Sequence, residues 1–102
     1  MVTKKVYSVI WSINAKDQLK EIYQFIKKES LQAAKDVKNK ILQSTRVLET
    51  GKEIYKLDDL RINNNGTYRA YTVYSYRITY KINETEIHIL RVRHTSREPL
   101  SH

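Results

Sequence analysis

Residues 68–99 read YRAYTVYSYRITYKINETEIHILRVRHTSREP, and this stretch decides the fold. It is rich in Tyr, Ile, Thr and Val, which are residue types that favour β-strands. Apolar and polar side chains alternate within it, which gives one side Ile78, Tyr80 and Ile82 and the other side Arg77, Thr79 and Lys81. A period of two predicts strands with one buried face and one face that is presented to solvent or to a partner.

A hairpin turn is predicted around residues 83–85. The favoured register pairs Tyr80 with His88 and Ile78 with Leu90. A slip by one residue would place arginines on the apolar face, and burying unpaired charge is costly. One face of the hairpin then carries apolar side chains, and the other carries mainly arginines.

This register has two consequences for the arginine-bearing face. It places Arg77 opposite Arg91, where like charges repel unless a carboxylate or a phosphate lies between them. It also leaves Ile87 and Ile89 on the same face as the arginines. We therefore expect something apolar to cover part of that face.

Upstream of this stretch, residues 6–11 predict a first strand, and two amphipathic helices follow. Asn14 is suited to cap the first helix and Ser30 the second, while Gly51 is suited to end the second. Apolar side chains recur at helical spacing in both helices: Leu19, Ile22, Tyr23, Ile26, Ala34, Val37, Ile41 and Leu48. The spacing predicts an antiparallel helical hairpin that lies on one face of a sheet.

The element order is therefore βααβββ, an α+β fold with an antiparallel sheet. Three consecutive strands favour an antiparallel meander. The first strand must join that sheet to bury its own apolar residues. A length of 102 residues fits one domain that spans residues 1–102.

The composition limits the kinds of partner. Nineteen Lys and Arg against eleven Asp and Glu give a formal charge of +8, which points to nucleic acid, an anionic surface or an acidic protein. The absence of cysteine excludes disulfides and thiolate metal sites. No apolar run is long enough for a membrane span, and the first residues do not resemble a signal peptide. We expect a cytoplasmic protein without a membrane anchor, a cofactor or a metal.

Candidate functional residues gather in the decisive stretch. Its cations are Arg69, Arg77, Lys81, Arg91, Arg93, His94 and Arg97. They either hold phosphate groups or form a solvated sheet face. Tyr71 is a candidate for stacking on nucleotide bases, whereas Tyr76 and Tyr80 are more typical of a core. Asp58 and Asp59 are candidate carboxylates near the cations, although such loop acids are usually only exposed.

Several motifs, taken in order, resemble the RelE/ParE toxins of bacterial type II toxin–antitoxin systems. They are W-S at Trp11, the segment Ala15–Leu19, G-x-Y-R at Gly66–Arg69, Y-R-I-x-Y at Tyr76–Tyr80, and I-L-R-V-R-H-T-S-R-x-P at Ile89–Pro99. The resemblance covers nearly the whole chain. It implies a βααβββ toxin that a cognate antitoxin holds inactive.

The resemblance leaves two mechanisms open. RelE-like members cleave mRNA in the ribosome, whereas ParE-like members inhibit DNA gyrase without cutting nucleic acid. In the first mechanism Arg77 matches the arginine at the scissile phosphate, and His94 and Arg97 lie where further catalytic groups are placed. Arg69, Tyr71, Lys81, Arg91 and Arg93 would then contact the nucleic acid.

From the sequence we expect a ribosome-dependent mRNA endoribonuclease that blocks translation. The alternative is a gyrase inhibitor without nuclease activity, so whether the protein is an enzyme stays open. A third possibility is a binding module with a toxin fold that has lost toxicity. The expected partners are an antitoxin and either the ribosome with mRNA or DNA gyrase.

Overall fold

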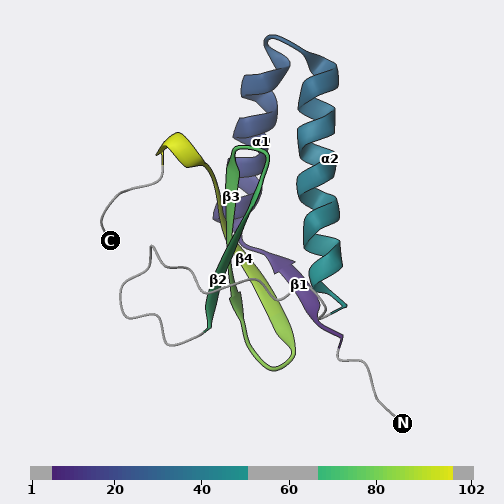
Figure 1. Ribbon diagram of the computed structural model, residues 1–102, viewed down its shortest axis with the longest axis vertical. Helices are drawn as coiled ribbons and strands as arrows, with labels where there is room; N and C mark the ends of the chain where they lie inside the picture. The colour runs from purple at the N-terminus through teal and green to yellow at the C-terminus, as the bar shows by residue number, and fades with distance from the viewer. Residues whose placement is uncertain (1–5, 51–66, 98–102) are drawn as a thin grey trace.

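The computed structural model describes residues 6–50 and 67–97. It has the βααβββ order that the sequence predicts, followed by a short 3-10 turn (Figure 1). The elements are β1 (Ser8–Trp11), α1 (Ile13–Lys27), α2 (Leu31–Leu48), β2 (Tyr68–Val73), β3 (Tyr76–Ile82), β4 (Glu86–His94) and η1 (Thr95–Arg97). The predicted end of the second helix at Gly51 lies outside the described residues.

The four strands form one sheet in the order β1-β4-β3-β2. β2, β3 and β4 make the expected antiparallel meander. β1 joins the sheet as expected, but it pairs with β4 in parallel, so the sheet is mixed rather than wholly antiparallel. A parallel pair requires a long connection between its strands, and here both helices and two strands lie between β1 and β4.

Both helices begin at a serine cap. The Ser30 hydroxyl accepts a hydrogen bond from the Ala33 backbone N–H at 3.0 Å, which confirms the predicted cap of α2. The predicted cap of α1 at Asn14 was wrong. Ser12 is the cap, and its hydroxyl accepts from the Ala15 N–H at 3.0 Å. The helix therefore starts as soon as β1 ends, before the chain reaches Asn14.

A β-bulge in β4 corrects the predicted register. Thr79 pairs with Arg91 and Tyr80 with Ile89, so Leu90 is the extra residue between them. The bulge shifts the alternation by one residue. Ile87 and Ile89 therefore point to the helix side and are fully buried, at 0% exposure, instead of lying among the arginines.

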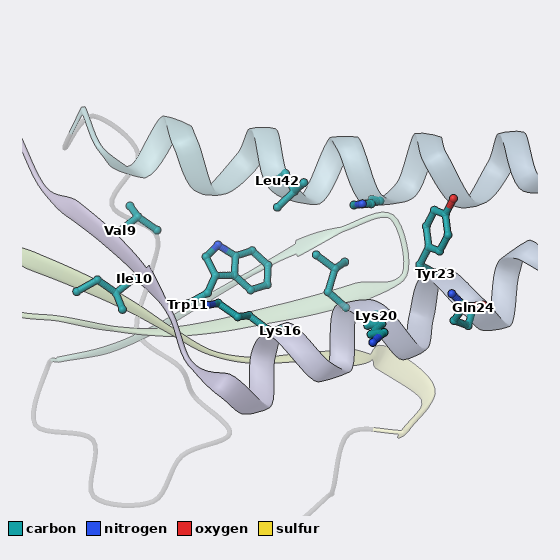
Figure 2. Close-up of a pocket in the computed structure, with 10 residues that line it drawn as sticks. Val9, Ile10, Trp11, Lys16, Lys20, Tyr23, Gln24 and Leu42 are labelled. Atoms are coloured by element: carbon teal, nitrogen blue, oxygen red, sulfur yellow. The ribbon is translucent and has the colours of Figure 1, made fainter.

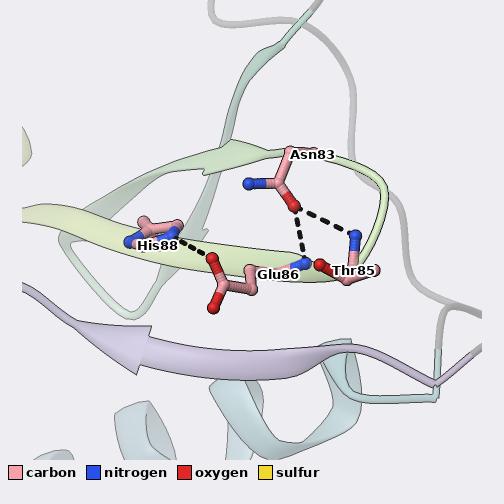
Figure 3. A network of polar contacts seen from close by, with 4 residues as sticks. All are labelled: Asn83, Thr85, Glu86 and His88. Carbon is pink, nitrogen blue, oxygen red and sulfur yellow. Dashed lines mark hydrogen bonds and ion pairs between the residues drawn. The ribbon is translucent and has the colours of Figure 1, made fainter.

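The two hairpin turns have different local chemistry. At the β3–β4 turn the Asn83 side-chain oxygen accepts from the backbone N–H groups of Thr85 and Glu86, at 3.0 and 2.7 Å (Figure 3). This places the turn where the sequence predicts it. At the β2–β3 turn Tyr74 has a φ of 55°, which is unusual for a residue other than glycine, asparagine or aspartate. Its ring is exposed, so no packing requires a tyrosine there.

The core lies between the helical hairpin and one face of the sheet. It joins residues from both helices and three strands: Ala15, Leu19, Ile41, Leu48, Tyr71, Ile78, Tyr80, Ile87, Ile89 and Val92. Leu19, Ile41 and Leu48 of the predicted helical stripes supply the helix side of this core. The opposite face of the sheet is left for the cations of β3 and β4.

Candidate functional site

Cations lie in rows across β3 and β4 on the face of the sheet opposite the helices. In these rows Arg77 of β3 faces Arg93 of β4, Thr79 faces Arg91, and Lys81 faces His88. We define the basic face by the side chains of Arg77, Lys81, Arg91 and Arg93. Lys81 is exposed and the three arginines are half-buried. Four cations on one sheet surface produce a concentrated positive potential that attracts anionic partners.

The bulge changes which arginines are neighbours on the basic face. Arg77 lies opposite Arg93 rather than Arg91, and Arg91 lies beside the buried Thr79. A like-charge pair across two strands remains, so an anion at this surface would still relieve repulsion. The reason for expecting an apolar cover no longer holds, because Ile87 and Ile89 lie on the helix side of the sheet.

Two of the predicted contacts to nucleic acid lie on the other side of the sheet. Arg69 pairs with Tyr80 and Tyr71 with Ile78, and both of these partners face the helices. Tyr71 is only 8% exposed, and its hydroxyl is 2.9 Å from the Ser44 hydroxyl. A ring held in this way presents no free surface for stacking on a base.

His94 is also on the helix side of the sheet, where it pairs with Tyr76. The two rings meet edge to face, with centroids 5.3 Å apart. The His94 Nδ1 accepts a hydrogen bond from the Ser96 backbone N–H at 3.1 Å and lies 2.7 Å from the Ser96 hydroxyl. This imidazole therefore organises the turn Thr95–Arg97, and the register does not bring it onto the basic face. The side chain of Arg97 lies outside the described part of the structure.

His88 is the histidine that the fold places beside the basic face, and it was not among the candidate functional residues predicted from the sequence. It pairs with Lys81, and its Nε2 is 3.1 Å from a carboxylate oxygen of Glu86 (Figure 3). The signal in the sequence was the spacing of two between Glu86 and His88, which puts both on one side of a strand. A carboxylate that orients an imidazole is one arrangement used for proton transfer.

The described residues hold neither a cluster of metal ligands nor a membrane-spanning helix. No group of three or more His, Cys, Asp or Glu within residues 6–50 and 67–97 could hold a metal ion. None of the described helices is long and apolar enough to cross a membrane. The candidate carboxylates Asp58 and Asp59 lie outside the described ranges.

The family model of the ParE toxin of the parDE type II toxin–antitoxin system matches residues 9–99 of this chain. The chain belongs to the ParE toxin family. Membership implies an antitoxin partner, and the match includes both helices and the whole meander that carries the basic face.

The fold comparison agrees with the family. A solved chain from the chromosomal ParDE toxin–antitoxin system of P. aeruginosa superposes with a TM-score of 0.70 at 17% sequence identity, covering 87% of this chain and 96% of that chain. At this identity the likeness shows a shared fold alone. No curated protein sequence matches the chain closely enough to count as a relative.

Proposed function

We propose that this ParE-family toxin arrests growth by binding DNA gyrase through its basic face, without cutting nucleic acid. The observation that carries the proposal is the match of the ParE toxin model to residues 9–99. ParE-like toxins are the gyrase inhibitors of the wider RelE/ParE group. The mRNA cleavage expected from the sequence becomes the second candidate.

The basic face suits binding. Arginine is enriched among the residues that dominate binding energy at interfaces, and three of the four cations of the basic face are arginines. A positive surface also accelerates encounter with a negatively charged target. Gyrase works on DNA, so a gyrase–DNA complex offers phosphates to these side chains.

The position of His94 disfavours the nuclease mechanism expected from the sequence. General acid–base catalysis needs a proton donor or acceptor within hydrogen-bond reach of the reacting group. Arg77 would hold the phosphate on the basic face, but His94 pairs with Tyr76 on the other face. A binding surface needs no such group, which favours gyrase inhibition over cleavage.

One observation keeps mRNA cleavage as the second candidate. His88 and Glu86 form an imidazole–carboxylate pair in the row of Lys81. Arg91 and His88 pair with Thr79 and Lys81, which are two residues apart on β3, so the bulge at Leu90 leaves them about 7 Å apart along the sheet. In this version Arg91 would hold a phosphate, and His88 would move the proton that His94 was expected to move.

Two assays on one preparation separate the candidates. We expect the purified protein to inhibit gyrase supercoiling while cell-free translation continues and the mRNA stays intact. The variant Arg77→Ala with Arg91→Ala should lose that inhibition. Lys27→Ala with Lys35→Ala, which removes two charges from exposed helix positions, is the matched control. Cleaved mRNA on stalled ribosomes, abolished by His88→Ala, would replace the gyrase proposal with the nuclease.

A further inference from the structure

The β2–β3 turn holds a tyrosine in a backbone conformation that suits other residue types better. Tyr74 has a φ of 55°, where the Cβ of an ordinary residue crowds the following carbonyl, and two-residue hairpin loops usually place glycine, asparagine or aspartate at such positions. Packing does not compensate for this strain, because the residue is 63% exposed. A strained and exposed residue of this kind points to a contact outside the chain.

The turn that carries Tyr74 is held in place by its neighbours. Val73 pairs with Tyr76 across the hairpin. The Ser75 carbonyl accepts a hydrogen bond from the Thr95 backbone N–H at 2.8 Å. The tyrosine is therefore presented from a fixed backbone, and a rigid aromatic ring loses little entropy on binding. These are properties of the anchor residues that dominate protein interfaces.

Tyr74 also lies at the edge of the basic face. Thr72, Arg77 and Arg93 form the row of that face nearest to the turn. A single residue separates Thr72 from Tyr74 along the chain. A partner that the arginines hold can therefore reach the tyrosine, and tyrosine and arginine are both enriched among the residues that dominate binding energy.

A groove of about 370 Å³ lies between this turn and α2. Its lining includes Val73 and also Val47, which is 39% exposed. Among the described residues that line it, Lys40 is the only charged one, and it is exposed. No described residue lines both this groove and the one that the Trp11 indole points into, between α1 and α2 (Figure 2). Apolar walls beside a cation suit an apolar side chain and a carboxylate of a protein partner.

We infer that Tyr74 anchors the toxin to a protein surface of gyrase, with an apolar side chain and a carboxylate of that surface entering the groove beside it. The inference rests on the gyrase inhibition proposed above, and it adds a contact that the basic face does not include. DNA fits this end of the molecule less well. Its phosphates would pair with Lys40 and leave Val47 and Val73 uncovered.

The first test asks whether the fold needs the tyrosine. Tyr74→Asn and Tyr74→Gly introduce residues that tolerate a positive φ. Their midpoints of urea unfolding should equal or exceed the wild-type midpoint, because strain is relieved and no packing is lost. Trp11 emission can follow this unfolding, since the indole packs against the core and points into the other groove (Figure 2). A lower midpoint for both variants would make Tyr74 a structural residue and overturn the inference.

The second test measures inhibition of gyrase supercoiling with the same preparations. Tyr74→Asn should raise the concentration for half-inhibition by at least about tenfold, as expected when an aromatic anchor is lost. Tyr74→Phe keeps the ring and should inhibit nearly as well as the wild-type protein. Phe25→Ala is the matched control, because Phe25 is 62% exposed on α1 and lines a different groove. Equal impairment of Phe25→Ala would show that the effect is not specific to the turn.

Binding measurements with separate partners identify what Tyr74 contacts. Tyr74→Asn should bind gyrase without DNA at least about tenfold more weakly than the wild-type protein, and its affinity for a DNA duplex alone should not change. A loss confined to the duplex would assign the tyrosine to nucleic acid and overturn the inference. Normal inhibition of gyrase with weakened binding of the purified cognate antitoxin would assign the turn to the antitoxin instead.

The same assays separate this inference from the proposed function. If the wild-type protein and Tyr74→Asn inhibit gyrase equally, the gyrase proposal stands and the role of Tyr74 falls. If the wild-type protein does not inhibit gyrase, both fall, whatever the unfolding midpoints are. Higher stability combined with weaker inhibition in Tyr74→Asn is the expected result, because a residue retained only for the fold would change both in the same direction.

Discussion

The two faces of the sheet are built from the same strands but hold side chains of opposite character. On β3, Ile78 faces the helices at 0% exposure, and its neighbour Arg77 faces the other way. On β4 the same separation holds for Ile89 and Arg91, with the bulge between them. Adjacent residues can therefore serve stability and binding independently. Variants on one face should change the free energy of unfolding, and variants on the other should change inhibition of the target.

The largest expected effect tests the helix side. Ile89→Ala should reduce the free energy of unfolding by about 2–5 kcal/mol, because it leaves a cavity in a packed core. Ile10→Ala is the matched control, since Ile10 lies on the other face and is 39% exposed. It should cost less than about 1 kcal/mol. Urea unfolding monitored by circular dichroism measures both, and equal losses would contradict the register that the bulge imposes.

The second prediction concerns the basic face. Arg77→Ala with Arg91→Ala should raise the concentration needed for half-inhibition of gyrase by at least about tenfold, since arginines often dominate binding energy. The unfolding transition in urea should stay close to that of the wild-type protein. If the variant inhibits normally, the basic face is not the contact with gyrase. If it unfolds far more readily, the two faces are not independent.

Much of the fold could be predicted from local patterns. The helical stripe that includes Leu19 and Ile41 and the order of the strands follow from periodicity. The bulge at Leu90 could not be predicted from a single alternation. Before the bulge the buried residues of β4 are at odd positions, Ile87 and Ile89, and after it the buried residue is at an even position, Val92. The extra residue at Leu90 causes this shift in the alternation.

The candidate site was predictable only where strand pairing agreed with the alternation. Arg77 and Lys81 follow the period of β3 and lie on the basic face as expected. Arg69 and Tyr71 do not lie on the basic face. The alternation within β2 does not show which face of that strand meets the helices. Pairing with β3 decides this, and it places both on the helix side. The roles assigned to Arg77, His94 and Arg97 in catalysis stay predictions.

The third prediction tests how the helix side supports the end of β4. Ile89 is the last residue of β4 that pairs with β1, and Val92 lies beyond it. The Val92 backbone N–H donates to the Gln18 side-chain oxygen at 2.8 Å. Gln18→Ala would leave this amide without its acceptor and should cost about 1–3 kcal/mol. Gln18→Glu keeps an acceptor and should cost less. Faster hydrogen exchange at the Val92 amide would identify the cause, whereas unchanged exchange would show that Gln18 is dispensable there.

The smallest expected effect is at the junction between β1 and α1. Ser12 caps the helix through its hydroxyl, which also donates to the Leu90 carbonyl at 3.3 Å, beside the bulge. Ser12→Ala should therefore cost about 1 kcal/mol, as the loss of a helix cap usually does. Asn14→Ala is the control that the sequence itself suggests, because Asn14 was the predicted cap and lies exposed within the first turn. It should change the urea midpoint little, and a larger loss for Asn14 than for Ser12 would restore the original assignment. Because the hydroxyl joins the helix start to β4, the loss at Ser12 should also exceed the loss for Ser30→Ala, whose hydroxyl caps α2 alone.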